Sequence, residues 1–303
     1  MKYIKTFVFT GALVIAFGFV AEANKIQKPS FSLTAQKTTP NQSLVENLTS
    51  SFLNKTPVQD FPPNLTLEEG KQIQAEFIQS LSPILGKPVG YKAGLTSQSA
   101  QTKFNVSHPL RGVLLAEMLL PNPAVVSPNF GAIPLVEGDL MVRVGSEDIN
   151  TATTTTEVLA SLDAVIPFIE LPDLVYAENI PLNAPNLQAI NVGARLGVMG
   201  HPIPLQPTPE WEEKLGKIQL IILDETGNQL AMGESNALLG HPLNVVLWLR
   251  DSLQAEGKSL HKGDLLSLGT ITPLMPVNPG TTIRAQYLGL NSNEPVEISV
   301  KFQ

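Results

Sequence analysis

Two apolar stretches in the middle of the chain most limit what it can fold into. Residues 136–144 read VEGDLMVRV, in which apolar and polar residues alternate as they do in a half-buried strand. The alternation places Glu137 and Asp139 on one face of that strand. A second apolar run, residues 165–171, carries Glu170 near its end. We therefore expect a fold built on strands in which three carboxylates converge.

Three convergent carboxylates suggest a site for a hard divalent cation. The chain has no cysteine, and its four histidines form no cluster near these acids, so oxygen-preferring Mg²⁺ or Mn²⁺ is favoured over zinc. The alternative is a solvated strand face, because carboxylates two apart on a strand commonly point into water. The residues alone leave both interpretations open.

Composition bounds the class of protein. The chain has 303 residues, of which 43% are hydrophobic and 16% charged, enough for one large globular domain. Its formal charge of −7 argues against nucleic acid or an anionic membrane surface as a partner. The absence of cysteine excludes disulfides, thiolate metal sites and a cysteine nucleophile.

The N-terminus has the pattern of a secretory signal peptide, residues 1–23. Lys2 and Lys5 precede an uncharged apolar run over residues 7–20, and the small-x-small sequence AEA follows at residues 21–23. The run is short for a membrane span, although an uncleaved anchor is the alternative. Cleavage would remove two lysines and one glutamate, which takes the formal charge from −7 to −8. We expect an exported protein, periplasmic or extracellular, with no membrane association afterwards.

The rest of the chain divides into a short leader and one domain. Residues 24–42 are polar and predict a flexible leader, and residues 43–303 predict a single domain. Within it, residues 43–86 predict helices, with a capping box in the sequence TLEE at residues 66–69. Residues 87–303 are dominated by strand patterns, which makes the expected class α+β.

Three further elements are predicted from local patterns. Residues 156–165 have apolar residues at helical spacing, and residues 217–233 form a hairpin pattern around the turn sequence DETG. Pro242 begins a helical pattern that ends before Gly257, in line with proline at the first turn and glycine after the last.

A lone lysine stands out in the sequence GYKAGLTS, residues 90–97. Lys92 lies between two glycines among small and apolar residues, which suits a buried, positioned ammonium group. An ordinary surface lysine is the alternative when this stretch is taken alone.

Taken together, three segments resemble one enzyme family. GYKAGLTS at residues 90–97, VEGD at residues 136–139 and IELPD at residues 169–173 resemble the 2-oxopent-4-enoate (vinylpyruvate) hydratase and 4-oxalocrotonate decarboxylase family. That family belongs to the superfamily with the fumarylacetoacetate hydrolase C-terminal fold, and the resemblance covers residues 66–302. It implies a mixed, strongly bent β-sheet roll with peripheral helices, an N-terminal helical portion and assembly into a homo-oligomer.

The resemblance also assigns the metal site. It implies that Glu137, Asp139 and Glu170 hold a divalent ion, usually Mg²⁺ or Mn²⁺. The family has Glu-x-Glu on the first strand, whereas this chain has Asp139 in the second place. Aspartate is one methylene shorter, so the ion must shift, the strand must move in, or a water must bridge.

The remaining site residues are assigned in the same way. The resemblance implies that Lys92 lies in the active site and that Gly269 and Thr270 bind the substrate carboxylate. Asp173 is a candidate catalytic residue that could orient Lys92 or a water, and the alternative is that it caps the next turn.

The implied activity is that of a lyase that hydrates a small 2-hydroxydienoate or 2-oxo-enoate acid. Decarboxylation of a 4-oxalocrotonate-like diacid is the alternative within enzymes, because it uses the same metal and lysine. A third possibility is an exported, non-catalytic binding protein, suggested by Asp139, by Ile190 where the family commonly has aspartate, and by the signal sequence.

Overall fold

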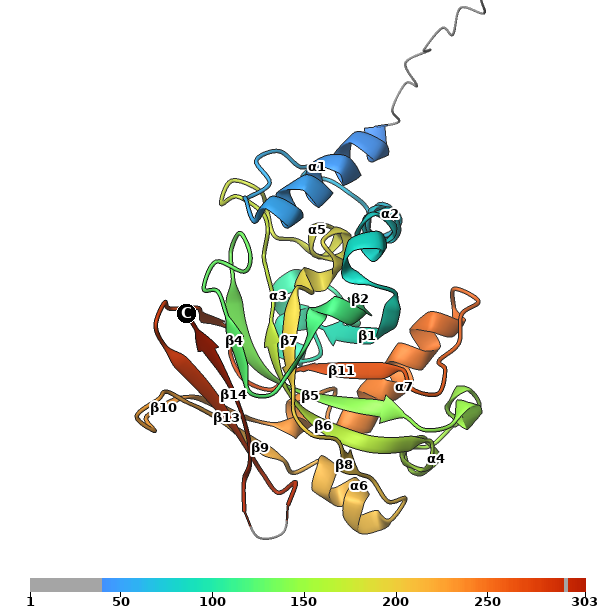
Figure 1. Cartoon of the computed structure of the whole chain (residues 1–303). Coiled ribbons are helices and arrows are strands. Elements are labelled where there is room, and N and C mark those ends of the chain that lie inside the picture. Colours follow the sequence, from blue (N-terminus) through green and yellow to red (C-terminus); the bar gives the residue numbers. More distant parts are fainter. Residues whose placement is uncertain (1–39, 292–293) are drawn as a thin grey trace, which may run out of the picture. The chain divides into compact units, whose positions relative to one another are not determined.

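Two β-sheets form the body of the protein (Figure 1). The computed structural model describes residues 40–291 and 294–303, which belong to one unit, Thr38–Gln303. The predicted signal peptide, residues 1–23, and most of the predicted leader lie outside the described residues. Helix α1 begins at Pro40, so the last three residues assigned to the leader, residues 40–42, are helical.

The larger sheet has nine strands and the smaller one five. The larger has the order β2-β1-β11-β5-β6-β7-β3, with β12 paired to β5 and β8 to β6, and the smaller has the order β10-β9-β13-β14-β4. The strands are β1 (Pro88–Gly94), β2 (Leu110–Leu115), β3 (Leu119–Pro121), β4 (Ala124–Val126), β5 (Leu135–Val144), β6 (Leu162–Leu171), β7 (Leu196–Met199), β8 (Ile203–Pro204), β9 (Gln219–Leu223), β10 (Gln229–Glu234), β11 (Leu265–Thr270), β12 (Met275–Pro276), β13 (Thr282–Leu288) and β14 (Val296–Phe302).

Helices surround the sheets. The α-helices are α1 (Pro40–Asn54), α2 (Leu67–Leu85), α3 (Gln98–Phe104), α4 (Thr155–Ala160), α5 (Ala184–Ala189), α6 (Pro209–Leu215) and α7 (Pro242–Gln254). Short 3₁₀ helices are η1 (Ala116–Met118), η2 (Glu147–Asn150), η3 (Asn191–Gly193) and η4 (Ser235–Ala237). Among the described residues, no helix combines the length and the apolarity that a membrane span needs.

Strand β5 places its side chains on alternate faces, as its sequence predicts, but both faces are buried, so the strand is not half-buried. Val136 and Leu140 join the core between the two sheets, and Glu137 and Asp139 point to the opposite face. Gly138 is on the core face, where a Cβ atom would collide with side chains of β9, so glycine permits the close approach of the two sheets.

The N-terminal helices pack on a second core. The buried faces of α2 and α5 meet β2, α1 packs on α2, and these helices gather at one end of the domain in Figure 1. The predicted capping box is confirmed: Glu69 N donates to the Thr66 hydroxyl at 3.2 Å, and Thr66 N donates to the Glu69 carboxylate at 2.7 Å.

One of the three elements predicted from local patterns is wrong over half its length. The hairpin of β9 and β10 and the helix that begins at Pro242 are confirmed. The predicted helix over residues 156–165, however, ends at Ala160, and β6 begins at Leu162. Strand β6 is buried on both faces, and such an unbroken apolar run fits a helical period as well as a strand period.

Tyr287 of β13 links the smaller sheet to the strands that carry the acids. Its side chain is completely buried, and its hydroxyl accepts a hydrogen bond from Phe168 N at 2.9 Å. The same hydroxyl donates toward the carbonyl oxygens of Phe168 and Asp139, at 2.7 and 2.8 Å. Burial raises the pKa of Tyr287 well above its usual value, so the hydroxyl keeps its proton.

We predict that Tyr287→Phe lowers the free energy of unfolding by about 2–3 kcal/mol, because it leaves buried backbone groups of β5 and β6 without a partner. Tyr176→Phe is the matched control, since Tyr176 is also buried but donates one hydrogen bond, to Asn186 O at 3.0 Å. Urea unfolding of both variants checks this. Equal losses would contradict the role given to Tyr287.

Candidate active site

A cavity of about 440 Å³ opens between β1, β5 and the turn that carries η3. Its polar lining includes Lys92, Glu137 and Thr270. Most of the remaining wall is apolar, and the large apolar residues include Leu95, Phe104, Leu174, Leu182, Leu187 and Leu274. A few polar groups in a mostly apolar cavity are typical of a small-molecule site.

Four charged side chains are buried together beside this cavity. Lys92 on β1 forms an ion pair with Glu170 on β6, and Glu137 on β5 stands directly opposite Glu170 in the strand register. Asp139 lies two residues further along β5, and all four side chains are nearly inaccessible to water. Three carboxylates and one ammonium leave two negative charges unbalanced.

The unbalanced charge is reflected in the pKa values of two acids. Burial raises the pKa of Glu137 well above its usual value, and the neighbouring Glu170 charge raises it further. Burial and the Glu170 charge also raise the pKa of Asp139, although the Ser267 hydroxyl and the Leu140 amide partly offset this. The cluster is therefore stabilised by an added positive charge, supplied either by protons or by a cation.

The turn at η3 fixes the lysine from the other side. Asn191 and Val192 have φ angles of 57° and 56°, a left-handed conformation that costs a non-glycine residue about 1 kcal/mol or more. The Asn191 amide bonds both backbone groups of Val113 on β2, at 2.7 and 2.8 Å, and accepts from Gln74 at 2.9 Å. With the turn held in this way, the Val192 carbonyl accepts a hydrogen bond from Lys92 Nζ at 2.9 Å.

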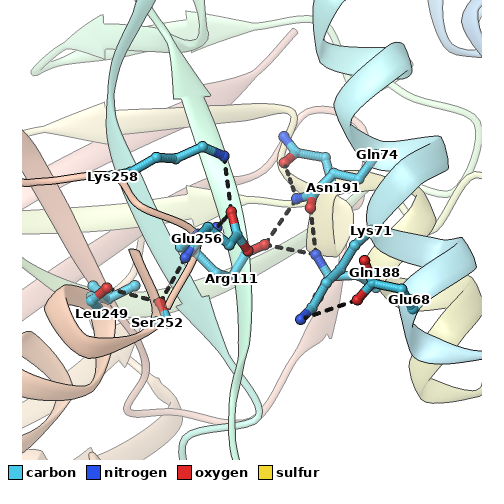
Figure 2. A network of polar contacts seen from close by, with 10 residues as sticks. All are labelled: Glu68, Lys71, Gln74, Arg111, Gln188, Asn191, Leu249, Ser252, Glu256 and Lys258. Atoms are coloured by element: carbon cyan, nitrogen blue, oxygen red, sulfur yellow. Dashed lines mark hydrogen bonds and ion pairs between the residues drawn. The ribbon is translucent and has the colours of Figure 1, made fainter. Parts of the chain in front are cut away.

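A polar network anchors β2, which lies at one edge of the larger sheet. Figure 2 shows the Arg111 carbonyl accepting from the side-chain amides of Gln74 and Gln188, at 2.8 and 2.9 Å. The Arg111 guanidinium donates to Ser252 at 2.9 Å and to Glu256 at 2.5 Å. Side chains of α2, α5 and the end of α7 thus hold the strand next to the one that carries Lys92.

Comparisons with known proteins agree on one group of enzymes. No family model matches the chain. It is 27% identical over 230 residues to 4-oxalocrotonate decarboxylase of Pseudomonas putida, covering 76% of this chain and 85% of that protein. It is also 27% identical over 237 residues to 2-keto-4-pentenoate hydratase of Paraburkholderia xenovorans, covering 78% of this chain and 86% of that protein.

Solved structures give the same result. The structure of 4-oxalocrotonate decarboxylase from Pseudomonas putida, complexed with magnesium and adipate, matches with a TM-score of 0.76 and 25% identity over 86% of this chain and 96% of that chain. The chain is similar to these hydratases and decarboxylases in sequence, and to the decarboxylase in fold. Fumarylpyruvate hydrolase from Pseudomonas aeruginosa, complexed with Mn²⁺ and pyruvate, has a TM-score of 0.51 at 13% identity over 70% of this chain and 88% of that chain. The predicted fumarylacetoacetate hydrolase type of fold is confirmed.

The three acids that the family resemblance assigns to the metal are brought together but do not form a ready-made coordination shell. Among the described residues, no group of three acidic or histidine side chains is arranged so that it could hold a metal ion. The Asp139 carboxylate accepts hydrogen bonds from Leu140 N and from the Ser267 hydroxyl, and its binding of a metal stays a prediction. Glu137 and Glu170 each keep one buried oxygen, Oε2, without a hydrogen-bond partner, which suits a cation.

Asp173, the candidate catalytic residue, is held by backbone amides and by Arg195. Its carboxylate accepts from the backbone amides of Ala132 and Ile133, at 3.0 and 2.7 Å, and forms an ion pair with Arg195 at 3.6 Å. Asp173 does not line the cavity that Lys92 lines. These contacts fit the alternative, a side chain that fixes the turn leading into β5, and a catalytic role for Asp173 stays a prediction.

The two predicted substrate-binding residues differ in their placement. Thr270 lines the cavity, and its hydroxyl donates to the Thr272 carbonyl. Gly269 has a φ of 102° and forms the bulge in β11, where a Cβ atom would collide with Ala93 O and the Thr96 side chain. Glycine is therefore required at position 269 by the backbone, and substrate binding by Gly269 and Thr270 stays a prediction.

Sequence reasoning missed several residues that shape the site. Val192 supplies the carbonyl that holds Lys92, Ser267 donates to Asp139, and Gln74 supports the turn from a distant helix. Each acts through contacts between segments far apart in the chain, and no local pattern signals such contacts. Ile190, which departs from the family pattern, is a buried core residue.

We predict that Asp173→Asn lowers the free energy of unfolding by about 1–3 kcal/mol, because the amide cannot accept both backbone hydrogen bonds and keep the ion pair. Asp163→Asn is the control, since Asp163 is half-exposed and pairs with Arg143 at the surface, where a pair contributes about 1 kcal/mol or less. Urea unfolding measures both variants. A stable Asp173→Asn protein with no turnover would contradict a purely structural role and support the catalytic one.

Proposed function

We propose that the protein is a divalent-metal-dependent hydratase that adds water to a small 2-hydroxydienoate or 2-oxo-enoate acid, of the 2-oxopent-4-enoate type. The observation that carries the proposal is the buried cluster of Lys92, Glu137 and Glu170 beside a largely apolar cavity of about 440 Å³. Hydratases with 26–28% identity over most of the chain support the reaction class.

The ion is proposed to be Mg²⁺ or Mn²⁺. The unpartnered oxygens of Glu137 and Glu170, and the two unbalanced negative charges of the cluster, fit a hard dication. The related decarboxylase binds magnesium, and the hydrolase with the same fold binds Mn²⁺. When bound, the ion would supply Lewis-acid stabilisation of negative charge on a 2-oxo acid.

The protein's own side chains bind the substrate, place a positive charge beside it and exclude water from the site. The Lys92 ammonium, held by Val192 and Glu170, is placed to hydrogen-bond the substrate carboxylate or a developing oxyanion. The apolar wall surrounds the hydrocarbon part of the substrate and keeps bulk water away from the charged groups. The proposed order is ketonisation of the dienol, followed by addition of water to the conjugated double bond.

Decarboxylation of a 4-oxalocrotonate-like diacid is the second candidate. Lys103 also lines the cavity and could pair with a second substrate carboxylate. The decarboxylase with a TM-score of 0.76 supports this candidate too. Faster turnover of the diacid than of the monoacid would favour it over hydration.

We predict that Lys92→Met lowers kcat/KM by at least about 100-fold, because it removes the positioned charge that the transition state needs. Glu137→Gln has an effect of the same order. Lys301→Met is the matched control, since Lys301 is exposed on β14, and it keeps full activity. The measurement is steady-state loss of diene absorbance with Mg²⁺ or Mn²⁺ present.

Full activity in both Lys92→Met and Glu137→Gln would contradict the site assignment. Binding of the substrate with no turnover at any divalent ion would instead support the third candidate, an exported binding protein that keeps the fold. A homo-oligomer remains a prediction, and a small 2-oxo acid is the proposed partner of the site.

We also propose that residues 1–23 direct export, on the evidence of the two lysines and the apolar run at the N-terminus. Expression of the full chain in a bacterium should yield a mature protein that begins at Asn24 outside the cytoplasm. Leu13→Arg, which interrupts the apolar run, should retain the protein inside. Cell fractionation with mass spectrometry of the N-terminus tests this. An intact N-terminus in the cytoplasmic fraction would contradict it.

A further inference from the structure

Asp139 occupies a different position from the other two acids of the cluster. Its Oδ1 atom accepts from Leu140 N at 2.5 Å, and its Oδ2 atom accepts from the Ser267 hydroxyl at 2.5 Å. The side chain is completely buried and, like that of Glu170, does not line the cavity, whereas Glu137 does. What distinguishes Asp139 is that both of its carboxylate oxygens are bonded to the protein.

In Glu137 and Glu170, unlike Asp139, one carboxylate oxygen has no hydrogen-bond partner. They stand directly opposite each other on β5 and β6, and one oxygen of each, Oε2, is buried without a hydrogen-bond partner. Glu170 Oε1 is taken by Lys92, so its second oxygen is the one available to a ligand. A buried carboxylate oxygen without a partner is unfavourable. A cation between Glu137 and Glu170 would give both unpartnered oxygens a partner.

Ser267 explains how Asp139 is kept in place. It lies on β11, in register with Lys92 on one side and Met141 of β5 on the other, and it is completely buried. Its hydroxyl donates a short hydrogen bond to Asp139. A charge-assisted bond of this kind is stronger than one between neutral groups, so it holds the shorter aspartate side chain to β11.

We propose that the divalent ion is bound directly by Glu137 and Glu170 alone, and that Asp139, held by Ser267, contributes charge from outside the inner coordination shell. The inference rests on the proposed function, because it concerns the same ion. Mg²⁺ is commonly held by one or two carboxylates, with water and substrate filling its other positions. The ion would therefore have two direct ligands from the protein instead of three.

Mn²⁺ binding to the purified, chelator-treated full chain tests the proposal without any measure of activity. Isothermal titration calorimetry and electron paramagnetic resonance report the affinity. Glu137→Gln and Glu170→Gln should each weaken binding by more than about 100-fold, because each removes an inner ligand. Asp139→Asn should weaken it by about 10-fold, at the low end of the effect of an outer-shell partner.

Ser267→Ala is a second test of whether Asp139 binds the ion directly or lies outside the inner coordination shell. If Asp139 lies outside the inner shell, loss of the Ser267 hydroxyl should change Mn²⁺ affinity by less than about 3-fold or tighten it. If Asp139 is an inner ligand oriented by Ser267, the same change should weaken affinity by about 10–100-fold. This variant keeps the test decisive if Asp139→Asn fails to fold, which thermal unfolding would show.

The outcomes distinguish failure of the inference from failure of the proposed function. Wild-type protein that binds neither Mn²⁺ nor Mg²⁺ would overturn both. Wild-type protein that binds Mn²⁺, with Asp139→Asn as defective as Glu137→Gln, would overturn the two-carboxylate arrangement alone. A 10–100-fold weakening in Ser267→Ala would also overturn it.

Discussion

The site depends on one electrostatic constraint: three carboxylates and a single ammonium are buried together with two negative charges unbalanced. Burying a charge without a partner costs several kcal/mol, so the cluster requires compensation. The raised pKa values of Glu137 and Asp139 show what happens without it, because protons then supply the missing positive charge. A divalent cation supplies the same charge and leaves the carboxylates ionised.

The fold keeps this cluster together by building it on neighbouring strands of one sheet. Lys92, Glu137 and Glu170 lie on β1, β5 and β6, and β11 between β1 and β5 contributes Ser267. The smaller sheet supports the arrangement from behind through Tyr287. Side chains on strands are positioned more rigidly than side chains on loops, which suits a site that must hold charge in a fixed place.

Much of this was predictable from local patterns. Alternation along residues 136–144 identified the face that carries Glu137 and Asp139, and the capping box at Thr66 identified the start of α2. Lys92 between two glycines was recognised as a candidate buried ammonium, and the structure places it at the cavity. In these cases the chemistry of a few adjacent residues decides the structure.

What the sequence could not predict has a common physical cause. Asp139 lies on one predicted strand and Asp173 follows another, but tertiary contacts decide their partners, Ser267 for Asp139 and Arg195 for Asp173. The Val192 carbonyl could not be recognised either, because its orientation depends on amides from distant segments. Sequence patterns identify residues that can do chemistry, and long-range hydrogen bonds decide which of them face the cavity.

Thermal unfolding with and without Mn²⁺ tests the central claim most directly. If the buried cluster is completed by a divalent ion, a 100-fold excess over the dissociation constant should stabilise the wild-type protein by about 2.7 kcal/mol and raise Tm by about 5 °C. A variant with both Glu137→Gln and Glu170→Gln should show no rise. Equal shifts in the two proteins, or no shift in the wild type, would contradict the account.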